Sequence, residues 1–257
     1  MIAKPIFIAG MQRSGTNYLF WNIEADKRVE AYNEDHPDAF TAYLLKSVEN
    51  TRELINRSTA NIILFKSITN TVIADALLSF PSAKIIWVMR DVNSVINSHE
   101  KEFGEQGFLS IERALNRFVL SEDCFFDSPD NKWPSILSHK NIQLKIKDYL
   151  SWYIKICENK YDIAGLFWAF INNMYFMLDL DKSNQVKVVF YEELVENPDK
   201  VFKEIGDFCG LSKFVYSIEP YKCEKNNPNL INTGIGMLCD LVRISIEKTE
   251  TLKWNTR

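Results

Sequence analysis

Short apolar runs alternate along the chain with longer segments that have helical spacing. Runs of this length that end at polar residues are typical of buried strands. They lie at 6–8, 29–32, 61–66, 83–89 and 186–190. Apolar residues spaced for helices follow them, at 18–23, 37–57, 67–79, 92–102 and 198–209. This alternation predicts an α/β fold, a parallel β-sheet flanked by helices on both faces.

Between about 103 and 182 the pattern predicts helices without strands, and this stretch is rich in aromatic residues. Its most apolar part, 163–178, is shorter than the roughly 20 residues that span a bilayer and contains Asn172 and Asn173, so we expect a buried helix. A last helix is predicted at about 236–247. We expect one domain over residues 1–257, with the helical stretch as an insert before the last strand.

A glycine-framed polar loop joins the first predicted strand to the first helix. Gly10 and Gly15 allow a tight turn whose N–H groups point inward, and the helix adds its positive N-terminus, which predicts an anion cradle. The frame G-x-x-x-x-G matches the start of a P-loop. Thr16 and Asn17, however, stand where a magnesium-nucleotide site needs Lys and Ser/Thr. The cationic side chain of this loop is Arg13, whose fork can grip an oxyanion.

Charged residues follow four of the predicted strands at their ends. They are Arg13, Glu34, Lys66 and Arg90. Because ligands of parallel sheets bind at the carboxyl ends of the strands, we expect these side chains to converge on one site.

Three stretches resemble the sulfotransferases that use 3′-phosphoadenosine 5′-phosphosulfate (PAPS). The segment Arg13-Ser14-Gly15-Thr16-Asn17 is similar to their 5′-phosphosulfate loop, 83–98 to their 3′-phosphate motif, and 186–211 to their strand, Tyr-Glu-x-Leu turn and Asn-Pro-capped helix. The resemblance implies a P-loop-like fold and transfer of a sulfuryl group from PAPS to an acceptor, with release of adenosine 3′,5′-bisphosphate (PAP) and no required metal. The implied acceptor is a hydroxyl of a carbohydrate, lipid or small metabolite, and the helical insert would shape its pocket.

The resemblance also implies roles for individual residues. Arg13, Ser14, Gly15, Thr16 and Asn17 would hold the 5′-phosphosulfate. Arg90 and Ser98 would bind the 3′-phosphate, Tyr191 would lie near the adenine, and Lys66 would stabilise charge on the transferring group. Two departures stand out: Ser67-Ile68 replaces the family's Thr-His or Ser-Pro, and its glycine- and lysine-rich closing loop has no clear match. Lys222, Lys225 and Arg243 are the candidates to replace that loop.

Glu34 is the predicted catalytic base, by its resemblance to the catalytic glutamate of bacterial and carbohydrate-type members, and His36 is its rival. His36 has the better unperturbed pKa near neutrality, whereas the pKa of Glu34 would have to be raised by desolvation. Asp91 is expected to cap its helix, and His99 to be a packed structural residue. His139 falls outside the motifs.

The composition indicates which binding partners and which cellular compartment to expect. A net charge of −4 and a pI near 5.6 argue against nucleic acid as a partner. Five cysteines without C-x-x-C pairing predict reduced thiols. We expect a soluble, cytoplasmic protein, although a chain trimmed of a membrane anchor would look the same, and no feature sets an oligomeric state. The alternatives to a sulfotransferase are a P-loop nucleotide kinase-like phosphotransferase and a non-catalytic PAP-binding module.

Overall fold

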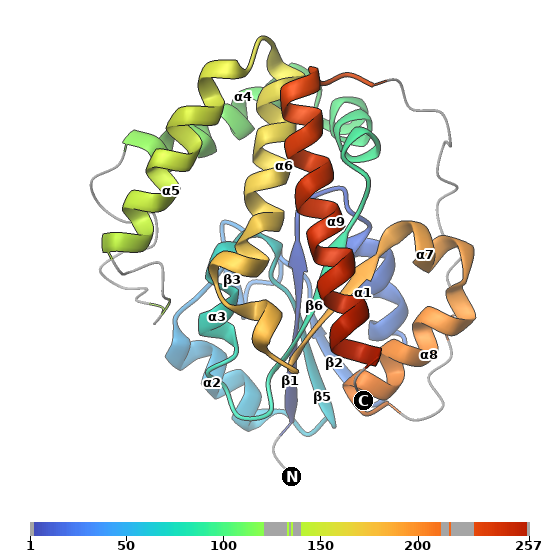
Figure 1. Cartoon of the computed structure of the whole chain (residues 1–257). Helices are drawn as coiled ribbons and strands as arrows, with labels where there is room; N and C mark the ends of the chain where they lie inside the picture. The colour runs from blue at the N-terminus through green and yellow to red at the C-terminus, as the bar shows by residue number, and fades with distance from the viewer. Residues whose placement is uncertain are drawn as a thin grey trace.

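The computed structural model describes residues 3–120, 133, 135, 140–211, 216 and 229–255. Its centre is a five-stranded sheet in the order β2-β5-β1-β6-β7, and every neighbouring pair is parallel. The strands are β1 (Lys4–Gly10), β2 (Val29–Tyr32), β5 (Ile62–Lys66), β6 (Lys84–Met89) and β7 (Val186–Phe190). Figure 1 shows the sheet behind a layer of long helices. The predicted parallel sheet and all of its strands are confirmed.

The strand sequences read as unbroken apolar runs because both faces of the sheet are covered. In β1, Phe7 and Ala9 pack into the core on one face, while Ile6 and Ile8 pack into the core on the other. All four side chains are almost completely buried. Helices must therefore cover the sheet from both sides.

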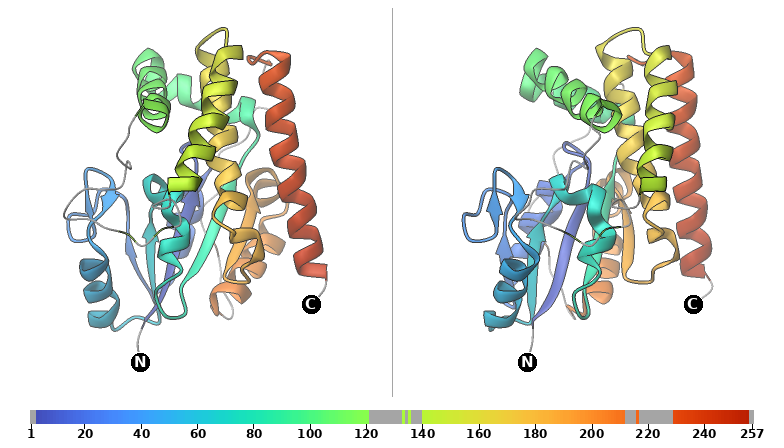
Figure 2. Two further views of the ribbon diagram at one scale, coloured as in Figure 1. Left: turned by 60° about the vertical axis from the view of Figure 1, so that its left-hand side comes forward. Right: turned by 90° about the vertical axis from the view of Figure 1, so that its left-hand side faces the viewer.

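The helices form two layers around this sheet, as the views in Figure 2 show. One face packs against α1 (Thr16–Glu24), α7 (Tyr191–Glu196) and α8 (Pro198–Cys209). The other packs against α2 (Val48–Arg57), a 3₁₀ helix (Ile68–Ile73) continued by α3 (Ala74–Leu77), α4 (Val92–Leu120), α6 (Lys160–Met177) and α9 (Thr233–Asn255). Beyond these lie α5 (Lys140–Tyr153), which contacts α4, and two 3₁₀ turns, Ile154–Ile156 and Leu180–Lys182. The described part of 103–182 is thus helical, as predicted.

The predicted helix over 37–57 is wrong in its first half. Residues Phe40–Thr41 (β3) and Leu44–Leu45 (β4) pair as a small antiparallel hairpin instead. Helix α2 begins only at Val48, where the hydroxyl of Ser47 accepts the N–H of Asn50 at 3.1 Å. A serine cap satisfies an N–H that the first helical turn leaves unpaired, so the helix begins after Ser47 and not at Pro37.

Two other helices extend beyond their predicted bounds. Helix α9 begins at Thr233 rather than 236, because the side chain of Asn232 accepts the N–H of Ile235 at 2.9 Å. Helix α4 runs to Leu120 across a kink at Gly104, where φ is 55° and ψ is −147°. Only glycine adopts that conformation easily, so the kink is built into the sequence.

Helix α6 is the buried helix predicted from the apolar run at 163–178. Asn172, fully buried, accepts the indole N–H of Trp87 at 3.2 Å and donates to the carbonyl of Trp168 at 2.9 Å. Its amide is therefore satisfied inside the core. Among the described residues no helix combines the length and apolarity needed to cross a membrane.

Candidate active site

The β1–α1 loop is a tight turn that depends on two glycines. Gly10 and Gly15 have φ of 130° and 95°. A Cβ on Gly10 would lie 2.3 Å from the carbonyl oxygen of Val88, and one on Gly15 would lie 2.1 Å from the ring of Tyr191. The hydroxyl of Thr71 accepts the N–H of Gly10 at 2.9 Å and donates to its carbonyl at 3.0 Å. Only glycine fits both positions, and the hydroxyl of Thr71 holds Gly10 in place.

Arg13 connects the loop to the stretch that resembles the 3′-phosphate motif. Its Nε donates to the hydroxyl of Ser98 at 3.1 Å, and its guanidinium pairs with Glu102 at 3.3 Å. Its carbonyl oxygen accepts from Arg90 at 3.1 Å. Arg90 in turn lies over the ring of Tyr191, 4.6 Å from the ring centroid. Residues far apart in the sequence thus meet at the loop.

Lys66 and Glu34 form an ion pair at the ends of neighbouring strands. Lys66 Nζ donates to Glu34 Oε1 at 2.8 Å, and the side chains are only 3% and 19% exposed. The other carboxylate oxygen of Glu34 is buried and has no hydrogen-bond partner among the described residues. His36 is half-buried, packs edge-on to Tyr32, and its Nδ1 accepts the N–H of Asp38 at 3.3 Å.

The four charged residues lie at the same edge of the sheet, in the order of its strands. Across the sheet from β2 to β6, the residues at or just past the strand ends are Glu34, Lys66, Arg13 of the loop and Arg90. A carboxylate therefore stands at one side of the loop and a second arginine at the other.

Other residues singled out from the sequence have structural partners. The Asp91 side chain accepts the N–H of Ser94 at 2.8 Å, so it caps α4 as predicted. Arg243 pairs with Glu247 at 2.9 Å and with Glu192 at 3.5 Å.

The described cysteines, Cys157, Cys209 and Cys239, are free, and burial raises the pKa of Cys209 to about 12. The remaining candidates, Lys222, Lys225, His139, Cys124 and Cys223, lie outside the described residues.

Three contacts at the site are missing from the sequence-based prediction. Thr71 anchors Gly10 and belongs to none of the predicted motifs, while Tyr191, predicted near the adenine, instead fills the space beneath Gly15. Glu102, the partner of Arg13, does have a readable signal, because it lies four residues after Ser98 on the same helix.

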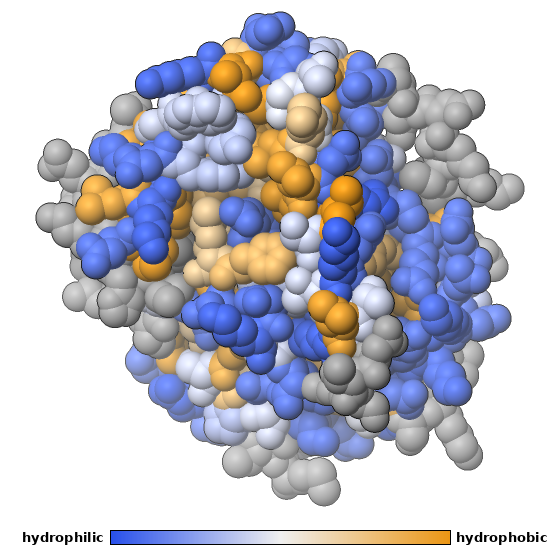
Figure 3. Space-filling model, viewed as in Figure 1, coloured by the Kyte–Doolittle hydropathy of each residue, from blue (hydrophilic) through white to orange (hydrophobic). Residues whose placement is uncertain are grey.

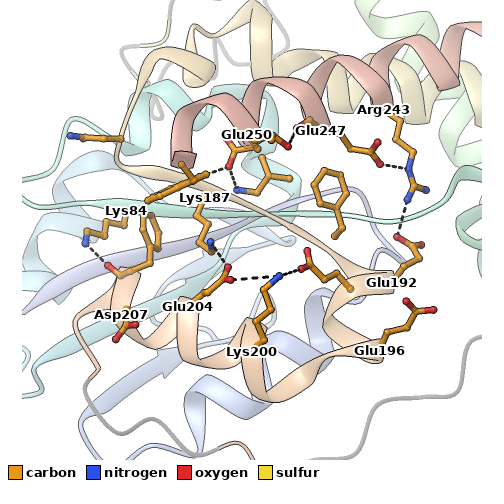
Figure 4. Close-up of a pocket in the computed structure, with 17 residues that line it drawn as sticks. Lys84, Lys187, Glu192, Glu196, Lys200, Glu204, Asp207, Arg243, Glu247 and Glu250 are labelled. Carbon is orange, nitrogen blue, oxygen red and sulfur yellow. Dashed lines mark hydrogen bonds and ion pairs between the residues drawn. The ribbon is translucent and has the colours of Figure 1, made fainter. Parts of the chain in front are cut away.

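Two of the cavities among the described residues differ in size and in lining. The larger, of about 980 Å³, runs along β7 between α8 and α9 and is lined by lysine and glutamate side chains that largely pair with one another (Figure 4). Of the residues singled out from the sequence, this lining contains Arg243, a candidate for the closing loop, but none of Arg13, Glu34, Lys66 and Arg90. The smaller, of about 220 Å³, is lined by Gly10, Met11 and Gln12 of the loop and by residues that follow Lys66.

The sequence matches the family model described as the sulfotransferase domain over residues 3–222. The chain belongs to this sulfotransferase family. No curated protein matches it.

Several solved sulfotransferases align with most of this chain. A sulfotransferase domain from the curacin biosynthetic pathway is 18% identical, with 89% of this chain and 81% of that chain covered and a TM-score of 0.47. A sulfotransferase from Alicyclobacillus acidocaldarius is 19% identical, with 98% and 96% covered and a TM-score of 0.47. The mouse sulfotransferase SULT7A1 complexed with PAP is 15% identical, with 93% and 64% covered and a TM-score of 0.39.

Proposed function

We propose that this sulfotransferase moves a sulfuryl group from PAPS to a hydroxyl of its acceptor and releases PAP. The observation that carries the proposal is the meeting of Arg13, Arg90 and Ser98 at the glycine-framed loop. Two guanidinium groups and a hydroxyl at one loop suit a ligand with two separate phosphate groups.

The loop residues fit the donor. Ser14 is 1% exposed, and its hydroxyl has no hydrogen-bond partner among the described residues. A buried polar atom without a partner is costly unless a ligand satisfies it. Ser14 adjoins the N-terminus of α1, where backbone N–H groups favour an anion. Arg13, Ser14, Gly15, Thr16 and Asn17 would therefore hold the 5′-phosphosulfate.

The other end of the donor would meet Arg90 and Ser98, which would bind its 3′-phosphate. Tyr191 is 3% exposed and packs beneath Gly15, so we assign it to support of the loop on the adenine side rather than to an open stacking surface. Its ring also holds Arg90 in place. The nucleotide would thus lie across the ends of β1 and β6.

When bound, PAPS supplies an activated sulfuryl group and a phosphate leaving group. Arg13 and Lys66 place positive charge where the leaving oxygen and the transferring group gain negative charge. Glu34 takes the proton of the acceptor hydroxyl as the new S–O bond forms and the old one breaks. Lys66 donates to Glu34 through one N–H and has others to offer, so it can hold the base and contact the sulfuryl group together.

The test is transfer of label from PAPS to a panel of hydroxyl acceptors in the presence of EDTA. We expect transfer to survive chelation, because the loop lacks the Lys and Ser/Thr of a magnesium site. Arg13→Ala should lower the rate by about 10²–10³-fold. Arg52→Ala, at an exposed position on α2, is the matched control and should leave the rate unchanged.

Two outcomes would overturn the proposal. Complete loss on chelation, with ATP turnover restored by magnesium, would favour a kinase-like phosphotransferase. Tight binding of PAP without transfer to any acceptor would favour a non-catalytic PAP-binding module.

A further inference from the structure

The smaller cavity opens beside the loop and is apolar inside. Its inner walls come from three elements: Ile68 and Val72 of the 3₁₀ helix, Ile111 and Ala114 of α4, and Ile171 of α6. Its lining also includes Gly10, Met11 and Gln12, so the cavity adjoins the loop, and Ile68 on its wall follows Lys66 by two residues. Its position suits a molecule that must reach the loop.

The polar side chains on the cavity wall are unevenly placed. Gln12 and Ser110 are exposed and Thr69 is half-buried, so these lie toward the mouth. The ionisable residue among the described lining residues is His99, which is 4% exposed. A single polar group therefore lies deep in an otherwise apolar wall.

His99 lies there without a side-chain hydrogen-bond partner among the described residues, and its ring packs against Phe103 and Phe108 at centroid distances of 4.8 and 5.5 Å. Burial lowers the pKa of His99, and the charge of Arg13 acts in the same direction, while hydrogen bonding with the Gly107 backbone opposes them. The imidazole is thus neutral near pH 7, with one nitrogen able to donate and one able to accept.

Gly107 provides the room for this arrangement. A Cβ there would lie 2.5 Å from His99 Nε2. The kink at Gly104 turns the second part of α4 back toward His99, which comes from the first part of the same helix. The two halves of α4 thus enclose one imidazole at the cavity.

The cavity volume limits what can enter. An apolar cavity of about 150 Å³ holds a benzene molecule. By simple proportion, about 220 Å³ holds a body close to naphthalene in size, or a short branched alkyl chain.

We propose that this cavity binds the apolar body of the acceptor and that His99 hydrogen-bonds a polar group on it, which makes the acceptor a small aryl or alkyl alcohol. The inference rests on the proposed function, of which it names the acceptor class. A sugar bears a hydroxyl on nearly every carbon, and the apolar inner wall would leave most of them without partners. The carbohydrate alternative is therefore disfavoured.

The test is direct binding of two isosteric probes, 2-naphthol and 2-methylnaphthalene, followed by the change in probe fluorescence. Wild-type protein should bind 2-naphthol about 5- to 10-fold more tightly, since one hydrogen bond to His99 distinguishes the two probes. In His99→Phe this preference should disappear while 2-methylnaphthalene still binds. A merely structural role for His99 would weaken both probes alike.

A second variant tests the cavity without touching His99. Ala114→Phe, at a half-buried wall position, should abolish binding of both probes, whereas Glu112→Phe, at an exposed position on the same helix, should not. An unchanged naphthol preference in His99→Phe would overturn the role of His99. Binding that ignores Ala114→Phe, or no binding to wild type, would overturn the cavity.

The transfer step gives an independent result. With labelled PAPS, 2,6-dihydroxynaphthalene, which has one hydroxyl for His99 and a second for transfer, should accept label in wild type and lose it in Ala114→Phe. Probe binding that follows the variants, with no transfer to any acceptor, would contradict the proposed function and leave the ligand cavity standing.

Discussion

Lys66 is the most deeply buried charged side chain of the candidate site, and its charge is balanced by Glu34. Removing one member of a buried ion pair leaves an uncompensated charge, which typically costs about 3–5 kcal/mol. The two residues therefore depend on each other for folding as well as for chemistry. A useful substitution at Glu34 must keep a hydrogen bond to Lys66 while removing the ability to take a proton.

Glu34→Gln meets that condition. The amide oxygen can still accept from Lys66, so PAP affinity should change little, while sulfuryl transfer should fall by about 10²–10⁴-fold because the base is lost. Rates from labelled PAPS and PAP affinity from calorimetry separate the two effects. A thermal unfolding curve for the variant shows whether the site remains folded.

His36→Ala is the companion measurement. The imidazole packs on Tyr32 at the surface of the same turn, so its removal should leave most of the turnover. Near-full turnover in Glu34→Gln together with inactivity of His36→Ala would transfer the role of base to His36.

At the scale of elements, α9 closes the open edge of the sheet along the larger cavity (Figure 4). Glu250, which is 7% exposed, accepts the backbone N–H of Val188 on the edge strand β7 at 3.1 Å and the indole N–H of Trp254 at 2.9 Å. Lys253 donates to the carbonyl of Val186 at 2.9 Å. Helix side chains thus satisfy backbone groups that an edge strand leaves unpaired. Burial and the bond to Glu250 raise the pKa of Tyr175, which stays protonated and donates to this carboxylate.

Glu250→Gln should therefore destabilise the protein although Glu250 is remote from the site. The single amide oxygen cannot serve the donors that two carboxylate oxygens serve, and a buried donor left unpaired costs about 1–3 kcal/mol. Urea unfolding measures the loss. Glu247→Gln, three residues earlier on the more exposed side of α9, should stay within about 0.5 kcal/mol of wild type. Equal effects of the two substitutions would contradict this role for Glu250.

The outer surface of α9 has a different character. Met237, Leu241 and Leu252 are each more than half exposed, and Figure 3 shows hydrophobic patches broken by hydrophilic residues on the face that carries α6 and α9. The predicted helix at 236–247 included Met237 and Leu241 but not Leu252. Its true length depends on Asn232 and on the contacts with β7, which are tertiary and have no local signal.

The sequence predicted elements wherever local patterns determine them. Buried strands such as 186–190 are set by runs of apolar residues, and the loop at Gly10 and Gly15 by residues that alone tolerate its geometry. The hairpin at 40–45 escaped prediction because its short strands have neither the length nor the alternation of a strand signal. His99 is buried against Phe103 and Phe108, as periodicity predicted, but its place at a cavity depends on the kink at Gly104 and on Gly107 and has no local signal.

For the molecule as a whole, the order of the strands determines where the charged residues of the candidate site lie. The sheet sets Glu34 and Lys66 on one side of the Arg13 loop and Arg90 on the other, toward β7. Acceptor, transferring group and bisphosphate nucleotide would then lie in a line across the carboxyl ends of the strands. An in-line displacement requires such an arrangement, because the attacking and leaving oxygens must stand on opposite sides of the sulfur.

The central claim is that this site is built for a nucleotide with both a 5′- and a 3′-phosphate. Calorimetric titration of the wild type and of Arg90→Ala with PAP and with 5′-AMP tests it most directly. AMP serves as the control because Arg90 also holds the loop through the carbonyl of Arg13, an effect that both ligands would feel.

The wild type should bind PAP about 10-fold or more tightly than 5′-AMP, and Arg90→Ala should weaken PAP binding about 10- to 150-fold and reduce the preference over AMP. Equal affinity of the wild type for PAP and 5′-AMP would contradict the account.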